Sequence, residues 1–171
     1  MDSLTQIALG ACVAAACVPA PHRRKALAVG AMLGTMPDLD VVVDYGDPVA
    51  NFTQHRGFSH SLIVLVPLAV AVWWAMKRWW PPVREAPGRW FAAVMLTLTT
   101  HVLLDAHTAY RTQLWWPLDS PPVAWATLFI IDPTYTLPLL IAAVVTLWRP
   151  RVAASGWCLA AALALSTAYL G

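Results

Sequence analysis

Residues 55–76 read "HRGFSHSLIVLVPLAVAVWWAM", so a polar, basic hexapeptide leads directly into a long apolar run. An apolar stretch of this length is typical of a helix that contacts lipid. Histidine and arginine side chains are costly to keep at the head of such a helix unless they pair with other groups or serve a function. The stretch therefore predicts a membrane helix that begins at a functional site.

The composition of the whole chain also indicates a membrane protein. The 171 residues are 59% hydrophobic and 12% charged, and the mean hydropathy is +0.60. Soluble domains carry about twice that charged fraction. The tryptophans cluster as "WWAMKRWW" (73–80) and "LWWPL" (114–118), which is typical of aromatic belts at membrane interfaces. The three cysteines are spaced too irregularly for a disulfide framework or a metal site.

Six apolar segments divide the chain, at 4–20, 26–43, 61–76, 90–106, 134–148 and 153–171. Several are shorter than the roughly 20 residues that a full span prefers, so we expect some to be tilted or re-entrant. Small residues, Gly10, Ala14, Gly30 and Gly34, predict close packing of the first two helices. We predict an all-α fold: a single domain over 1–171 that forms a polytopic transmembrane bundle of five to six segments.

Charge separates the two sides of this bundle. The loops after the first, third and fifth segments hold nine of the eleven Lys and Arg residues. The positive-inside rule makes that side cytoplasmic. Eight of the nine acidic residues and four of the five histidines fall on the other side. We therefore expect a site at the extracytoplasmic face of a bacterial inner membrane.

Two motifs on this side supply metal-ligand side chains. "THVLLDAHTAY" (100–110) places His101 and Asp105 four residues apart, on one face of a helix about 6 Å from each other. Alone, such a pair is as compatible with a simple hydrogen bond as with a metal. "PDLD" (37–40) adds Asp38 and Asp40, whose alternative role is to cap a helix.

The hexapeptide "HRGFSH" contributes the next candidates. We expect His60 in the first turn of the following helix, as a further metal ligand. Arg56 could hold a phosphate or carboxylate through paired hydrogen bonds, or could extend to lipid headgroups. For His55, ligation and contact with headgroups remain open alternatives.

Two later residues complete the candidate set. Arg111, in "AYRTQLWWPLDSP", is predicted to assist Arg56 in substrate binding. Asp132 precedes Pro133 at the start of the fifth segment, which is typical of a helix cap, although a carboxylate here could also orient a ligand histidine in catalysis.

Mixed histidine and aspartate ligands suit zinc, with manganese or iron as alternatives, better than calcium. Such an ion activates water for hydrolysis. The sequence contains no GxSxG, Walker or HExxH motif. Metal-assisted hydrolysis is therefore the reaction class that the residues favour.

Five motifs occur in order along the chain: "MDSLTQIALG", "GTMPDLD", "HRGFSHS", "HVLLDAHTAYRTQLWWPL" and "FIIDP". This set resembles the bacterial family described as LexA-binding, inner-membrane, metal-dependent hydrolases. The resemblance implies a multi-pass hydrolase whose candidate site residues are Asp38, Asp40, His55, Arg56, His60, His101, Asp105 and Asp132. It also implies an association with LexA, which would have to use the cytoplasmic loops. Gln6 stands where that family typically has histidine.

We predict a hydrolase that cleaves an ester or phosphoester of a lipid or lipid-linked substrate. Its metal ligands are predicted to be His60, His101, Asp105 and Asp38, and Asp40 is predicted to complete a site or to act as general base. No direct contact with nucleic acid is expected. One alternative is a non-enzymatic membrane adaptor with a structural metal or none. The other is an ion or proton carrier, which would distribute its polar groups across the bilayer.

Overall fold

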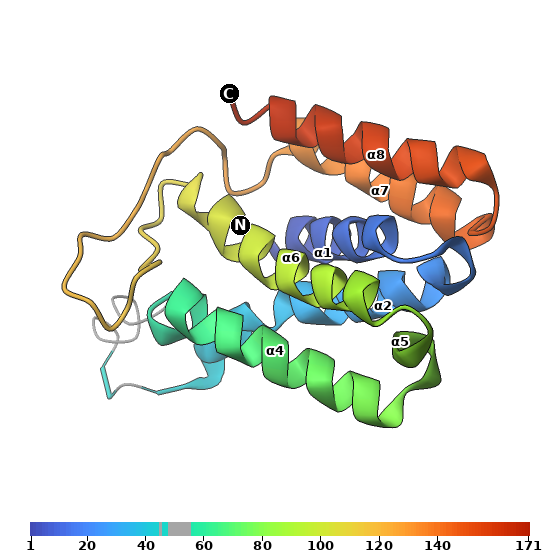
Figure 1. The fold of residues 1–171 in the computed structure, drawn as a ribbon. Coiled ribbons are helices and arrows are strands. Elements are labelled where there is room, and N and C mark those ends of the chain that lie inside the picture. Colours follow the sequence, from blue (N-terminus) through green and yellow to red (C-terminus); the bar gives the residue numbers. More distant parts are fainter. Residues whose placement is uncertain (45, 48–55) are drawn as a thin grey trace.

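The computed structural model describes residues 1–44, 46–47 and 56–171, and this part of the chain is helical (Figure 1). The long helices are α1 (Ser3–Cys17), α2 (Arg23–Thr35), α4 (Leu62–Trp79), α6 (Pro87–Ala106), α7 (Pro133–Trp148) and α8 (Ala153–Ala168). Shorter elements are the 3₁₀ turns η1 (Ala20–His22), η2 (Pro37–Val42) and η3 (Phe58–His60) and the short helix α5 (Pro81–Glu85). Each of the six predicted segments overlaps one long helix, so the all-α prediction is confirmed.

Pro37 and two aspartates interrupt the second predicted segment, 26–43, and the α-helix ends just before them. α2 ends at Thr35, and the 3₁₀ turn η2 follows from Pro37. Proline has no N–H to donate to the preceding turn of an α-helix. Tighter bonds replace the α-helical ones, with Leu39 N donating to Met36 O at 3.2 Å and Val43 N to Asp40 O at 2.9 Å.

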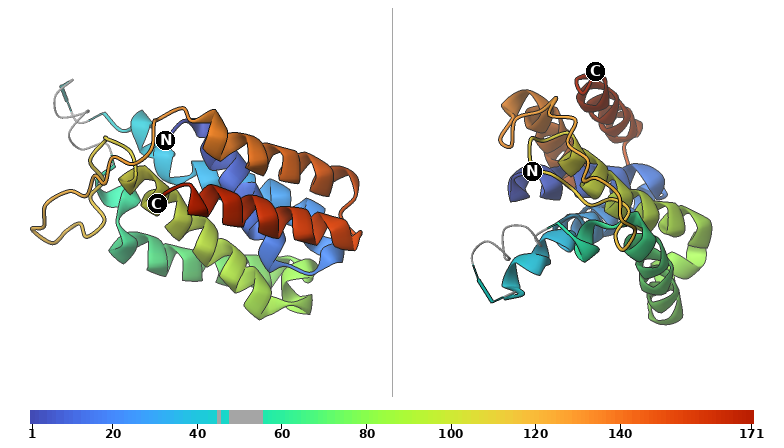
Figure 2. Two further views of the ribbon diagram at one scale, coloured as in Figure 1. Left: turned by 90° about the horizontal axis from the view of Figure 1, so that it is seen from above. Right: turned by 90° about the vertical axis from the view of Figure 1, so that its left-hand side faces the viewer.

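Helix α1 occupies the centre of the bundle and packs against α2, α6, α7 and α8 (Figures 1 and 2). Its contact with α2 is close because small residues meet there. A Cβ added to Gly34 would lie 2.5 Å from the carbonyl oxygen of Gln6, and one added to Gly30 would overlap the backbone of Gly10. The predicted close packing of these two helices is confirmed.

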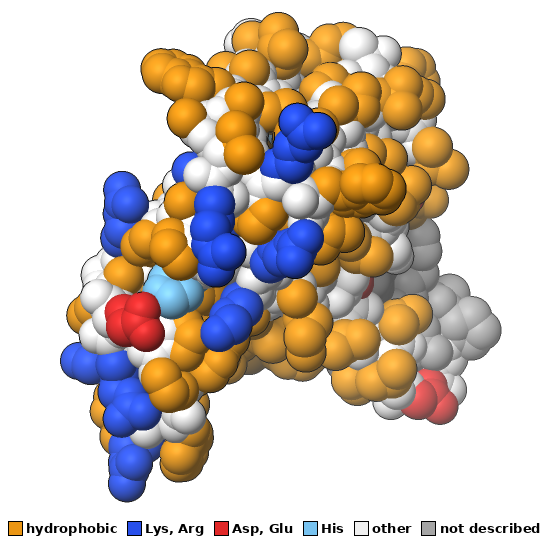
Figure 3. Space-filling view, turned by 90° about the vertical axis from the view of Figure 1, so that its right-hand side faces the viewer, with side chains coloured by type: hydrophobic (Ala, Val, Ile, Leu, Met, Phe, Trp, Pro, Cys, Tyr) orange, Lys and Arg blue, Asp and Glu red, His pale blue; other side chains and the backbone are white. Residues whose placement is uncertain are grey.

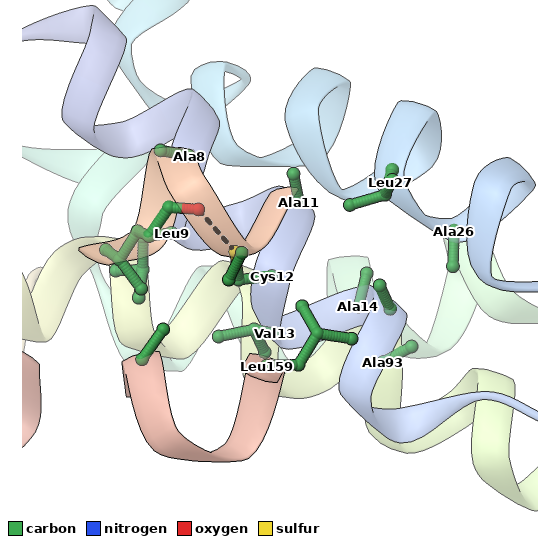
Figure 4. Packing of buried hydrophobic residues seen from close by; sticks show 14 of the residues in the cluster. Ala8, Leu9, Ala11, Cys12, Val13, Ala14, Ala26, Leu27, Ala93 and Leu159 are labelled. Atoms are coloured by element: carbon green, nitrogen blue, oxygen red, sulfur yellow. Dashed lines mark hydrogen bonds between the residues drawn. The ribbon is translucent and has the colours of Figure 1, made fainter. Parts of the chain in front are cut away.

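The interior around α1 is built from small and branched apolar side chains (Figure 4). Cys12 is fully buried, and its thiol donates to the carbonyl of Leu139 on α7 at 3.2 Å. The three cysteines are free, as predicted. They serve as packing residues because Cys behaves as a small hydrophobe when buried.

Helix α4 lies at the edge of the bundle, where it packs against α6. Among the described helices it is the one that is long and apolar enough to cross a membrane, by length and composition, with a mean hydropathy of 1.5 over its 18 residues. Only 11% of that window is buried inside the protein. Helices α1, α7 and α8 are apolar but shorter, so the number of spans stays a prediction.

The two ends of the bundle differ in charge. The turns between α1 and α2, α4 and α6, and α7 and α8 lie at one end, where Lys and Arg side chains gather (Figures 1 and 3). His22 lies at this end too, 2.8 Å from Glu85. The opposite end carries η2, η3, the C-terminus of α6 and the loop 107–132 (Figure 1). The chain thus separates its basic turns from its candidate ligands, as the sequence predicted; which side of a membrane each faces stays a prediction.

Candidate metal centre

Four of the predicted ligands meet at the end of the bundle that lies opposite the basic turns. Asp38 comes from η2, His60 from η3, and His101 and Asp105 from α6. Each offers one ligand atom, and the four atoms lie within 4.8 Å of one another. The side chains of His60, His101 and Asp105 are at most 1% exposed, whereas that of Asp38 is 23% exposed. Four of the residues predicted as ligands, from three segments far apart in the sequence, thus lie together.

The spacing of the four atoms suits a small divalent ion. His60 Nε2 lies 3.0 Å from Asp105 Oδ2, 3.3 Å from His101 Nε2 and 3.3 Å from Asp38 Oδ1. His101 Nε2 lies 3.4 Å from Asp105 Oδ2 and 3.5 Å from Asp38 Oδ1. A tetrahedral ion with bonds of about 2.0–2.1 Å spaces its ligand atoms about 3.3–3.4 Å apart. The donor set therefore fits zinc or a similar ion.

The hydrogen bonds of His60 determine which nitrogen faces the centre. Ser59 Oγ donates its proton to Asp40 Oδ2 at 2.6 Å, so it accepts from His60 Nδ1 at 2.9 Å. The proton of a neutral imidazole then lies on Nδ1, and Nε2 presents its lone pair to the centre.

A hydrogen bond also places a proton on Nδ1 of His101. Its Nδ1 lies 2.7 Å from the carbonyl oxygen of Gly34, which is an acceptor and requires a proton on Nδ1. When both rings are neutral, each therefore turns the lone pair of its Nε2 inward, toward two carboxylates. This donor arrangement suits a divalent cation, and backbone or carboxylate partners behind the ring are typical of metal-bound histidines.

Each carboxylate oxygen of Asp105 has its own partners. Its Oδ2 faces the histidines, whereas Oδ1 contacts the Arg56 guanidinium at 3.2 Å and the amino group of Met1. Burial alone would raise the pKa of the Asp38 carboxyl group. When no ion is bound, hydrogen bonds from His101 and His60, protonated at Nε2, hold that pKa below its usual range.

Arg56 is held in a backbone conformation that non-glycine residues rarely adopt, with φ of 63°. Its N–H donates to Asp40 Oδ2 at 3.0 Å, and its carbonyl accepts from Gln113 N at 3.1 Å. These bonds direct the side chain inward, where Nη1 donates to Thr108 Oγ1 at 3.2 Å. The Nε–H has no partner among the described residues and is buried, so an anion beside Asp105 could accept from it.

Other predicted site residues lie outside the four-residue group. Asp40 is 4.0 Å from His60 Nδ1, on the far side of the ring from the centre, and supports it through Ser59. Its predicted role as a ligand or general base is therefore replaced by a positioning role. His60 itself lies on η3, not in the first turn of α4, because Ser61 caps that helix by accepting from Ile63 N at 3.2 Å.

Asp132 is a helix cap. Its Oδ1 accepts from the backbone N of Thr134 at 3.0 Å, and its Oδ2 accepts from the Tyr169 hydroxyl at 3.1 Å. Asp132 is therefore not one of the four residues of the centre. Arg111 is exposed on the loop after α6. His55 lies outside the described residues.

Sequence reasoning missed the role of Ser59, because a serine beside a histidine has no distinctive pattern. It also left Gln6 undecided. The Gln6 side chain is 1% exposed, and its Nε2 donates to the backbone carbonyl of His101 at 3.3 Å. Its Oε1 has no partner among the described residues.

Comparison with known proteins places the chain in a family. The family described as "YdjM inner membrane protein" matches residues 1–171. The chain belongs to the YdjM family. It is also similar to the inner membrane protein YbcI of Escherichia coli (strain K12), with 30% identity over 91 residues. That match covers 53% of this chain and 51% of YbcI, so the chain spans about half the length of this relative. No solved structure matches.

The names of both relatives support an inner-membrane location for this YdjM-family chain. The exposed face of α4 agrees with that location, because valines and tryptophans project from it away from the bundle. Membership of the family thus supports the membrane assignment that composition predicted.

Proposed function

We propose that this chain is a membrane-embedded, metal-dependent hydrolase that cleaves an ester or phosphoester of a lipid or lipid-linked molecule. The observation that carries the proposal is that the inward-facing Nε2 atoms of His60 and His101 and the carboxylates of Asp38 and Asp105 offer four ligand atoms within 4.8 Å of one another. A divalent ion held there would lower the pKa of a water molecule and polarise an ester or phosphoester oxygen.

The residues of the chain divide the remaining work. His60, His101 and Asp105 are buried and would hold the ion rigidly. Asp38 is the most exposed of the four, so substrate would approach on its side. Arg56, beside Asp105, would bind the anionic group of the substrate through its Nε–H and the nearby edge of its guanidinium.

Lipid is the proposed substrate class because of where the centre lies. It adjoins η3, which leads within two residues into α4, the helix best suited to cross a membrane. A molecule that is already in the bilayer reaches this position without leaving it.

One observation favours a second candidate, a structural metal in a non-enzymatic membrane adaptor. Structural zinc sites are commonly closed by four protein ligands, whereas catalytic sites keep a position open. Four donors are present here, so the behaviour of Asp38 distinguishes a catalytic site from a structural one. If Asp38 leaves the ion or shares it with substrate, the site is catalytic. If Asp38 stays bound to the ion, the site is structural.

The experiment measures bound metal and hydrolysis on the same purified protein. We expect stoichiometric zinc, manganese or iron by elemental analysis, and its loss in His101→Gln and Asp105→Asn. The matched control is His22→Gln, which changes a histidine at the opposite end of the bundle beside Glu85 and should keep the metal.

Hydrolysis is then followed by mass spectrometry with phospholipids in mixed micelles, before and after chelation and re-addition of metal. Turnover that disappears with chelation and in His101→Gln supports the hydrolase. Bound metal with no turnover on any ester or phosphoester supports the adaptor. Equal metal in the wild type and in both centre variants would refute the assignment of ligands.

A further inference from the structure

A groove of about 320 Å³ opens between η2, η3 and the first turns of α4. Its two polar lining residues are Asp40 and Ser59. The apolar walls include Met36, Leu39, Val43, Phe58, Val64 and Leu68. The groove is thus apolar, apart from one polar patch formed by Asp40 and Ser59.

That polar patch lies behind His60, on the side of the ring that faces away from the metal centre. Ser59 and Asp40 are the residues that hold Nδ1 of His60, at 2.9 Å from the serine oxygen. Pro37, which precedes Asp38, also lines the groove. A molecule in the groove therefore lies against the side chains that support one ligand and beside the turn that carries another.

The surroundings of the groove are apolar and exposed. Leu39 and Phe58 at the groove are 58% and 41% exposed, and Val41 and Val42 on the same 3₁₀ turn are 74% and 80% exposed. A short turn with this many exposed apolar side chains is unfavourable against water but not against lipid. Since the chain belongs to an inner membrane protein family, acyl chains are the apolar molecules that surround it.

We propose that this groove binds one acyl chain of a membrane lipid beside η2, the turn that carries Asp38, the most exposed ligand residue of the metal centre. The inference rests on the proposed function in one respect, because the bound chain is taken to belong to the substrate. It adds the location of the binding site and predicts a preference for long-chain substrates.

The first test measures occupancy without using activity. The protein is reconstituted in nanodiscs that contain a phospholipid with a diazirine on its acyl chain, irradiated, and mapped by peptide mass spectrometry. We expect adducts on the segment 58–68. Val64→Trp, which fills the groove, should reduce them about tenfold, as expected when roughly two methylene groups can no longer be buried.

The matched control is Val66→Trp, on the same helix but outside the groove, where the native side chain is 41% exposed. It should leave the adducts unchanged. Leu68→Trp repeats the test if Val64→Trp does not fold, as judged by thermal unfolding. Adducts at Ile141, which is 59% exposed on α7, measure the labelling caused by contact with bulk lipid.

The second test compares hydrolysis of long-chain and water-soluble short-chain substrates. Val64→Trp should lose the long-chain activity about tenfold and keep the short-chain activity and the bound metal. Equal labelling of 58–68 and Ile141 in all variants would overturn the groove as a site. So would adducts that map to a second copy of the chain.

The two proposals fail in different ways. If the protein hydrolyses no ester or phosphoester but 58–68 is labelled and Val64→Trp removes the label, the hydrolase fails and the acyl site stands. If hydrolysis occurs and Val64→Trp changes neither labelling nor chain-length preference, the acyl site fails and the hydrolase stands.

Discussion

Replacing Ser59 by alanine would test whether the hydrogen bonds that link His60 to Ser59 and Asp40 hold a metal ligand in place. The hydroxyl accepts from His60 Nδ1 at 2.9 Å and donates to Asp40 Oδ2 at 2.6 Å. In Ser59→Ala the buried Nδ1–H loses its acceptor. Asp40 does not replace the hydroxyl without moving, because its oxygen is 4.0 Å from Nδ1.

The expected magnitude follows from two independent estimates. A buried N–H without a partner costs about 1–3 kcal/mol. Loss of a residue that orients a metal-bound histidine typically lowers metal affinity about 10–100-fold, which is about 1.4–2.8 kcal/mol. The two ranges agree. We therefore expect the Kd for zinc to rise about 10–100-fold in Ser59→Ala, and to recover largely in Ser59→Thr.

The assay is competition for zinc between metal-free protein and a chromophoric chelator. Ser61→Ala is the matched control, because this hydroxyl caps α4 and donates to Trp116 O at 2.5 Å but does not contact a ligand histidine. It should lower thermal stability and leave the Kd unchanged. An unchanged Kd in folded Ser59→Ala would refute the reasoning.

Two further predictions concern stability. Gly30→Ala places a methyl group against the backbone of Gly10 and should destabilise the protein by about 1–3 kcal/mol, as measured by thermal unfolding. The control is Gly88→Ala, where the added methyl group meets open space and should be neutral or slightly stabilising in the same assay. Asp132→Ala removes the cap of α7 and should cost about 1–2 kcal/mol. It should leave bound metal at the wild-type level by elemental analysis, and a loss of metal from the folded variant would return Asp132 to the site.

The helices could be predicted from the sequence because they depend on local patterns. Each long helix lies within or close to an apolar segment of the chain. In the segment 26–43 the sequence shows that Pro37 and two aspartates interrupt the apolar run, but not that Asp38 and Asp40 then lie on a 3₁₀ turn. Apolar content does not reveal which kind of backbone follows a proline.

The sequence placed Asp38 among the ligands and left Asp40 as a further ligand or general base, but the direction of each carboxylate could not be predicted. Both aspartates lie on the same short turn, and composition treats them alike. The structure directs Asp38 toward the two histidines and Asp40 toward Ser59 and the backbone of Arg56. The direction of each carboxylate depends on how η2 is held against η3, which is a contact between segments some twenty residues apart.

The sequence by itself determined that the chain is a helical membrane protein, where its helices run, and that its basic turns lie apart from its histidines and aspartates. These properties follow from hydrophobicity and charge, which act locally along a chain. Only the tertiary structure decided how closely the four ligand atoms approach one another, which nitrogen of each histidine faces the centre, and that Asp40 lies behind His60 and does not complete the ligand set. Ligand geometry is set by ångström-scale packing between distant segments, and one segment's residues do not specify where another's will lie.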